Sequence, residues 1–337
     1  MIGLNVQERI RATNQGTIAF LDGSPLFLFG MIEFQSWFHH LDSFAEIPLH
    51  RKLLYAATDS YEHLKYLGIK KPNTFFGQKK FSSQINAQWQ ALGWGNFSLR
   101  NMSIMSSVNS ELTTGFSLAI VEFLKGRRMN IEHFQEREHI IRISTEPSGR
   151  QMIPIPPVQR FDWEFDKQPI EYEDLGFEID QRNVGWYVDD QRSFFIPVES
   201  FRQFYHSLLS VNFSSKHRRN ELLDIQGIQN LQIHVFRTAL LSSAITEFES
   251  NVPCFVQSEY DWKNILTLTT SIRGFGVVEI QHFELQTKSV SMTMRGFNAP
   301  YLIGKIWSKW DKAIGESSKC RVKVGKNEIS VDFYPIV

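Results

Sequence analysis

The sequence predicts an α+β protein of two tandem homologous units, each an antiparallel sheet packed by helices, arranged together as a pseudo-dimer. The stretches "ALGWGNFSLR" and "SIRGFGVVEI" both combine a helix end, a Gly-aromatic-Gly turn and a strand start, which aligns Gly93 with Gly274. Upstream, "FQSWFHHL" matches "FRQFYHSL", which aligns Phe34 with Phe201 at a shorter offset. Two matched blocks in the same order predict an internal duplication.

Length and composition indicate an ordinary globular protein. A chain of 337 residues suggests two domains, at roughly 100 to 200 residues per domain. Thirty-six basic residues balance thirty-six acidic ones, so no overall field favours nucleic acid or an anionic membrane. Cys254 and Cys320 are too few for a disulfide framework or a cysteine-based zinc site. Without a signal sequence or an apolar run of about 18 residues, we expect a cytoplasmic protein with no membrane span.

The matched blocks place the first unit at residues 1–145 and the second at 192–337, with a proline-rich connector at 146–191. The connector has no sustained helical or strand period, which is typical of an extended segment. Trp163, Phe165 and Tyr172 indicate that it lies against the domains. The change of offset between the two blocks implies an insertion in the second unit, which we expect around its long apolar stretch "IQNLQIHVFRTALLSSAITEF".

Hydrophobic spacing predicts the elements of the first unit. Apolar residues three and four apart predict two helices, one on Leu53, Ala57, Tyr61 and Leu64, ended by Gly68, and one on Phe81, Ile85, Trp89 and Leu92. Beyond the Gly-Trp-Gly turn, Phe97 and Leu99 alternate with polar residues as in a half-buried strand.

In the second unit, "VVEIQHFELQTKSVSMTMRGF" predicts two strands, with Val290, Met292 and Met294 on one face of the second. The end of the chain, "CRVKVGKNEISVDF", predicts a closing hairpin. Between these hairpins lies a predicted helix in each unit. The pairs Gly115-Phe116 and Gly296-Phe297, which have the same offset as the two turns, are each expected to open that helix.

This order of signals resembles the 4-vinyl reductase (4VR) domain, in the wider fold of TRAPP tethering subunits and haem nitric-oxide sensors. The stretches "LGWGNFSL" and "RGFGVVEI" match its helix end, and "TTGFSLAIVEFLKG" and "MRGFNAPYLIGKIW" match its small-residue helix. Its closing Glu, Cys, Gly, Cys segment is matched in part, since Glu316, Cys320 and Gly325 fit but Ile329 replaces the second Cys. The first unit has neither Cys, and Ile140 lies near the second position.

The resemblance implies a dimeric, regulatory module that binds a small molecule or hydrocarbon in an apolar pocket between helices and sheet. Its zinc ion, present in some members, is not expected here because the second unit lacks one of the two cysteines and the first unit lacks both. Residues near each helix-sheet junction are the expected lining of such a pocket: Trp37, Phe38, Trp89, Trp94, Phe116, Phe204, Phe275 and Phe297. The alternative is that these side chains fill the core to native density without any cavity.

No motif points to catalysis. His133, Glu136 and His139 are spaced by three, as metal ligands on a helix would be, but the following "IIRIS" predicts a strand, in which neighbouring members of such a set point to opposite faces. His39, His40 and His206 are expected as hydrogen-bonded boundary residues. Phosphate loops and serine-nucleophile elbows are absent from the sequence. We therefore predict no catalytic residue, no metal and no cofactor.

The function expected from these observations is non-catalytic binding or regulation, with the units sensing a small apolar ligand of the hydrocarbon or lipid type. The alternative is a structural subunit that binds a protein partner within a larger assembly. A third possibility, implied only by the family name, is an accessory protein of a reductase.

Overall fold

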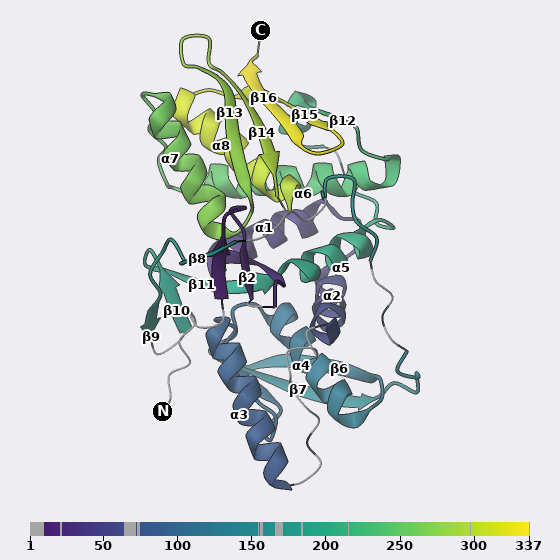
Figure 1. Cartoon of the computed structure of the whole chain (residues 1–337). Coiled ribbons are helices and arrows are strands. Elements are labelled where there is room, and N and C mark those ends of the chain that lie inside the picture. Colours follow the sequence, from purple (N-terminus) through teal and green to yellow (C-terminus); the bar gives the residue numbers. More distant parts are fainter. Residues whose placement is uncertain are drawn as a thin grey trace.

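The computed structural model of the chain describes residues 10–20, 22–63, 72, 75–153, 155, 158–165, 171–182, 185–214, 216–296 and 298–336. Helices and three largely antiparallel sheets make up this part of the chain, which confirms the predicted α+β class. A central sheet lies between two larger lobes, one above it and one below it in Figure 1.

The central sheet has the strand order β8-β1-β2-β3-β11-β10-β9. Its strands are β1 (Ile10–Thr13), β2 (Ile18–Phe20), β3 (Pro25–Gly30), β8 (Tyr172–Glu173), β9 (Asp180–Arg182), β10 (Gly185–Val188) and β11 (Gln191–Pro197). β9 and β10 lie within the predicted connector, so that segment contributes strands as well as extended chain.

The pairing of β3 with β11 is symmetric. Leu28 lies opposite Phe195, and each is followed three residues later by the first residue of a helix, Met31 of α1 (Met31–Phe44) or Val198 of α5 (Val198–Leu208). The paired residues extend two pairs beyond Leu28 and Phe195 in each direction along the strands. The two strand-helix segments therefore lie side by side in the middle of the central sheet.

Each lobe contains helices and one further sheet. The first lobe comprises α2 (His50–His63), α3 (Phe75–Ala91), β4 (Asn96–Ser98), β5 (Ser103–Met105), α4 (Ser110–Lys125), β6 (Met129–Arg137) and β7 (Ile140–Pro147). The second comprises η3 (Arg218–Leu222), β12 (Leu223–Gln226), α6 (Asn230–Glu249), α7 (Glu259–Thr269), η4 (Ser271–Arg273), β13 (Val277–Glu284), β14 (Ser289–Arg295), α8 (Ala299–Ile314), β15 (Ser318–Val324) and β16 (Ile329–Pro335).

The sheets of the two lobes have the same order of strands. The first reads β4-β5-β7-β6, and the second reads β13-β14-β16-β15 with β12 added at the outer edge. β12 and η3 lie in the longer link of the second lobe, because α5 ends at Leu208 and α6 begins only at Asn230. The extra residues thus include a segment before the long apolar stretch, which itself forms α6.

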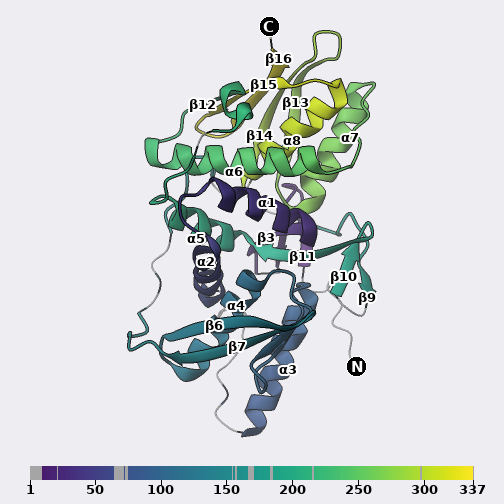
Figure 2. The ribbon, with the colours of Figure 1, turned by 180° about the vertical axis from the view of Figure 1, so that it is seen from behind.

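α1 packs on the second lobe, and α5 packs on the first lobe. α1 lies along α6, and α5 lies beside α2, as Figure 2 shows. The indole Nε1 of Trp37 donates to the carbonyl of Ala239 at 3.3 Å, and Lys52 Nζ donates to the carbonyl of Ser207 at 2.7 Å. This exchange, which the sequence did not predict, ties both lobes to the central sheet.

Glycines bring the paired helices of each lobe together. A Cβ atom on Gly115 would lie 2.2 Å from the carbonyl oxygen of Leu54, and one on Gly304 would lie 2.1 Å from that of Leu240. α4 therefore crosses α2, and α8 crosses α6, at a distance that only glycine allows. Because they occupy the same place in the two crossings, Gly115 and Gly304 are structural counterparts.

The prediction that both Gly-Phe pairs open a helix was wrong. Gly115 and Phe116 lie inside α4, while Gly296 precedes α8 and Phe297 lies outside the described residues. The cause is the hairpin before α8, whose strands have eight and seven residues where β4 and β5 have three each.

Most other predicted elements are present. Phe81, Ile85 and Trp89 lie buried on α3, and the three apolar residues predicted on one face of β14 are all buried. In the closing hairpin, β15 pairs with β16 as predicted, with Val322 opposite Val331. Leu64 and Gly68 lie outside the described residues.

The connector lies against the folded body at Trp163. This indole is buried and its ring centroid is 5.1 Å from that of Phe236 on α6. Phe165 is partly buried, whereas Tyr172 is 45% exposed. The prediction of packing is therefore correct for the first two aromatic residues.

Candidate functional site

The predicted ligand-binding residues lie in two separate places. Seven of them are described and all are buried in aromatic clusters: Trp89, Trp94 and Phe116 in the first lobe, and Trp37, Phe38, Phe204 and Phe275 around α1, α5 and the second lobe. The eighth, Phe297, is outside the described residues.

The first-lobe cluster is closed by direct ring contacts. Trp94 stacks on Phe116 with centroids 4.0 Å apart, and Trp89 meets Trp94 edge to face at 5.8 Å. The indole of Trp94 also donates to the carbonyl of Phe195 at 2.6 Å, across to β11. The flanking glycines have φ values of 76° and 105°, which only glycine adopts readily. Trp94 thus seals the helix-sheet junction.

The second cluster is equally dense. Phe275 stacks on Phe27 at 4.8 Å and on Tyr301 at 5.2 Å. Trp37 lies 5.5 Å from Phe201, within the same continuous set of rings. The aromatic residues therefore contact one another where the sequence led us to consider a ligand.

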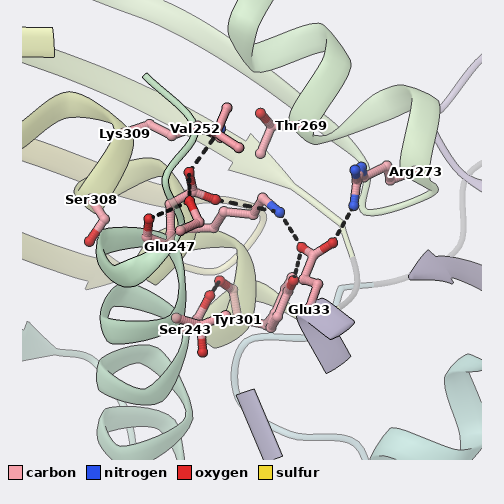
Figure 3. A network of polar contacts seen from close by, with 12 residues as sticks. Glu33, Ser243, Glu247, Val252, Thr269, Arg273, Tyr301, Ser308 and Lys309 are labelled. Atoms are coloured by element: carbon pink, nitrogen blue, oxygen red, sulfur yellow. Dashed lines mark hydrogen bonds and ion pairs between the residues drawn. The ribbon is translucent and has the colours of Figure 1, made fainter. Parts of the chain in front are cut away.

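A largely buried group of charges lies at this junction of the second lobe: the ion cluster, which consists of Glu33, Glu247, Arg273, Tyr301 and Lys305 (Figure 3). Glu33 comes from the first turn of α1, and the other four come from α6, η4 and α8 of the second lobe. The cluster thus joins the exchanged helix α1 to the lobe on which it packs.

Glu33 is the centre of the ion cluster. One of its oxygens accepts from Arg273 at 2.5 Å, and the other accepts from both Tyr301 and Lys305. Lys305 Nζ lies 3.6 Å from the carboxylate of Glu247, which a second lysine of α8, Lys309, approaches to 3.1 Å. Three donors from the second lobe therefore converge on one carboxylate of α1.

Burial and charge set the protonation states. Burial alone would raise the pKa of Glu33, but Arg273 and Lys305 hold that pKa far below its ordinary value. Burial lowers the pKa of Lys305, an effect that Glu33 partly offsets. The pKa of Tyr301 is raised well above its ordinary value by burial and by Glu33, so its hydroxyl stays protonated and donates.

The arrangement is suited to a structural contact. Each cation of the ion cluster faces a carboxylate, which is how buried charges are compensated in protein interiors. The same positions in the first lobe carry no such charges. Lys305 and Phe116 each directly follow the glycine of their helix crossing, and Glu247 and Tyr61 each lie seven residues after the leucine that faces that glycine. Phe275 and Trp94 are the aromatic residues of the two Gly-aromatic-Gly turns.

The ion cluster was not predicted from the sequence. The available signal was a charged residue inside an apolar helix, as in "MIEFQSWF" and "YLIGKIW". Such residues are rarely buried without a partner. The partners of Glu33 lie in a distant part of the chain, so the pattern alone does not identify them.

The predicted histidines lie apart from the ion cluster. His40 Nε2 is 2.9 Å from Glu249, which links α1 to α6, while His39 and His206 are exposed. His133 and Glu136 are on β6, and Glu136 pairs with Arg142 at 2.7 Å. Within the described ranges, no three His, Cys, Asp or Glu side chains are grouped closely enough to hold a metal.

A polar cavity of about 180 Å³ lies between α1, β11 and the first lobe. Gln35 of α1 lines it and donates to the carbonyl of Val108 at 3.2 Å, while Arg192 of β11 donates to the carbonyl of Ser106. Burial lowers the pKa of Arg192. The sequence did not single out this cavity, and none of the predicted aromatic residues lines it.

Comparison of the chain with protein-family profiles, curated proteins and solved structures found no match. None of the helices in the described part of the chain is both long enough and apolar enough to cross a membrane.

Proposed function

We propose that this chain is a non-catalytic binding protein of two homologous, 4VR-like units joined as a pseudo-dimer, and that it serves as an interaction subunit of a larger assembly. The observation that carries this proposal is the direct contact between the aromatic residues expected to line a ligand pocket, above all the stacking of Trp94 on Phe116 at 4.0 Å. Rings in contact favour a filled core over a sensor cavity.

Matched anchor residues support a common origin of the units. α4 and α8 each have an asparagine at the N-cap position, Asn109 or Asn298, and each ends at a left-handed glycine, Gly126 or Gly315. Both pairs have the same separation along the chain as the two crossing glycines described above. The symmetric pairing of β3 with β11 is the contact expected between two copies of one unit.

Exposed apolar side chains support the interaction role. Val252, Phe255 and Tyr260, in and after the link from α6 to α7, are 53%, 81% and 71% exposed. We call residues 252–260 the apolar link. Contiguous exposed apolar patches are typical of protein-binding sites, and these three exposed side chains lie within nine residues of the chain.

The test is purification of the tagged full chain from cells, followed by quantitative mass spectrometry of the proteins that accompany it. We expect Phe255→Asp to lose a specific set of proteins at least tenfold, and Gln257→Asp, in the same link, to retain them. A stoichiometric apolar adduct in native mass spectra of the purified chain would instead support the ligand-sensing function. If Phe255→Asp changes nothing, the apolar link is not the contact and the proposal fails.

A further inference from the structure

The outer edges of the two lobe sheets differ. In the second lobe, β12 pairs in parallel with the outer edge of β15, with Leu223 opposite Cys320 and Ile225 opposite Val322. In the first lobe β6 is the outermost strand of its sheet in the described part of the chain. The link from α1 to α2 is only five residues long there and contains no counterpart of β12.

The two edge strands begin at the same structural point. The N–H of Met129 donates to the carboxylate of Glu122 at 2.8 Å, and the N–H of Ser318 donates to that of Asp311 at 3.0 Å. Each acid lies in the last turns of the preceding helix, seven residues before the strand. Ile131 and His133 of β6 therefore correspond to Cys320 and Val322 of β15.

No strand of the described residues occupies the place of β12 in the first lobe. Cys320 and Val322 are both 0% exposed beneath β12, whereas Ile131 and His133 are only partly buried. The N–H of Met129 donates to Glu122 and therefore not to β7. In an antiparallel pair only every second residue bonds the neighbouring strand, so the N–H groups of Ile131 and His133 also point away from β7, toward the free side of β6. No backbone group in the described part of the chain accepts from these N–H groups, so they form a template for another strand.

Charge indicates what the missing strand carries. In the second lobe, Asp224 of β12 faces Arg321 of β15 at 3.5 Å. The residue of β6 that corresponds to Arg321 is Glu132, an exposed acid. A strand added beside β6 in the position of β12 would match the charge of Glu132 if it carried a Lys or Arg where β12 carries Asp224.

We propose that the outer edge of β6 binds an extended segment of a partner protein, which joins the sheet as a parallel strand with a Lys or Arg opposite Glu132 and apolar residues on either side of it. The inference rests on the proposed interaction function and names the chemistry of one partner segment. Main-chain hydrogen bonds supply affinity in such strand addition, and the alternate side chains supply specificity.

The experiment uses the full chain and two labelled peptides. One has the sequence of residues 220–229, which includes β12, and the other is the same peptide with Asp224→Lys. Fluorescence anisotropy at low salt should show at least tenfold tighter binding of the Asp224→Lys peptide. The Glu132→Lys chain should reverse this preference, because the substitution reverses the charge beside the bound peptide. Glu132 is exposed, so the fold should not change.

A second variant tests the main-chain contact. His133→Pro removes an outward N–H and leaves the ladder to β7 intact, so we expect loss of peptide binding with an unchanged melting temperature. Absence of binding to the wild-type chain, or equal preference of the wild-type and Glu132→Lys chains, would overturn the proposal. Either result leaves the proposed function standing if Phe255→Asp still loses its accompanying proteins.

Discussion

The junctions of the two lobes have one backbone arrangement and two kinds of chemistry. In the first lobe, Tyr61, Trp94 and Phe116 form an aromatic cluster in which Trp94 stacks on Phe116. In the second, the corresponding residues are Glu247, Phe275 and Lys305, of which two are charged and buried. Close helix crossings are thus compatible with either an apolar or an ionic filling.

The partner helix accounts for the difference. α5 brings Ser200 to the first lobe, where its hydroxyl hydrogen bonds with that of Ser60 at 2.7 Å. α1 brings Glu33 to the second lobe, where its carboxylate accepts hydrogen bonds from three side chains of that lobe. Exchange of the two helices would bury Glu33 against Phe116 without a cation, at a large cost in free energy. The ion cluster therefore makes the docking of α1 specific for the second lobe.

The largest expected effect is that of Glu33→Gln. The substitution takes the carboxylate from the partly buried Arg273 and leaves the buried Lys305 with Glu247 alone, at 3.6 Å. Breaking a buried pair costs about 3–5 kcal/mol, and the exposure of Arg273 places the expected loss at the lower end of that range. Ser200→Ala, the matched change in the first lobe, removes one neutral hydrogen bond and should cost about 1 kcal/mol. Urea unfolding measures both. Similar losses from the two variants would contradict the asymmetry between the lobes.

The same variant has a defined pH dependence. The pKa of Glu33 is lowered from its ordinary value of 4.5, so its stabilisation is complete above that pH and is lost as pH falls toward the folded-state value. The advantage of the wild-type chain over Glu33→Gln should therefore be constant near neutral pH and shrink in acid. An advantage that grows on acidification would show that Glu33 is not held as the carboxylate.

The glycine crossings should respond alike. Gly115→Ala and Gly304→Ala each place a methyl group against a carbonyl oxygen of the facing helix, so we expect each to lower the free energy of unfolding by about 1–3 kcal/mol. Urea unfolding of both variants checks the equivalence of the two crossings. Ser110→Ala, on the turn that begins α4, is the control. A tolerated Ala at one crossing only would mean that the two crossings are not structurally equivalent.

Trp94→Phe gives the turn of the first lobe the same aromatic residue as the turn of the second lobe, where Phe275 lies between its two glycines. The variant loses the hydrogen bond to the carbonyl of Phe195 and part of the indole volume, which we expect to cost about 1–2 kcal/mol. Thermal melting with near-ultraviolet circular dichroism measures the change. If Trp94→Phe is as stable as the wild type, the two plugs are interchangeable and the carbonyl contact contributes nothing.

Asp59→Asn should give the smallest effect, and only at neutral pH. Burial, with a contribution from Glu62, raises the pKa of Asp59 from 3.8 to about 6, so the folded state holds this proton more tightly than the unfolded state. The ionised form therefore costs stability above that pH. The variant should melt about 2–3 °C higher than wild type at pH 8, and the gain should vanish as pH falls through 6 toward 3.8.

The second lobe offers a reference for this change, because Ile245 stands in place of Asp59 on α6. Ile245→Val, which adds no titrating group, should shift the melting temperature equally at all pH values. A pH-independent shift for Asp59→Asn as well would show that Asp59 is not the titrating group.

Local patterns predicted the elements whose boundaries depend on neighbouring residues. The Gly-aromatic-Gly turns adopt the positive φ values that glycine permits, with 83° and 109° at Gly274 and Gly276. The alternation along β14 places its apolar residues in the core. The prediction failed at Gly296. The longer hairpin of the second lobe moves the start of α8 toward the C-terminus, and the Gly-Phe pair found in both halves of the sequence made the unshifted alignment look correct.

The amino-acid order was enough to define the α+β class, the turns and the burial of the aromatic residues, because helix and strand periods and glycine conformations act over a few residues. The exchange of α1 and α5, the ion cluster and the open edge of β6 were decided only in the tertiary structure. Glu33 and Arg273 are far apart in the sequence, and a buried carboxylate takes whichever donors the fold brings to it. Such pairings depend on how whole elements dock, and no local period encodes them.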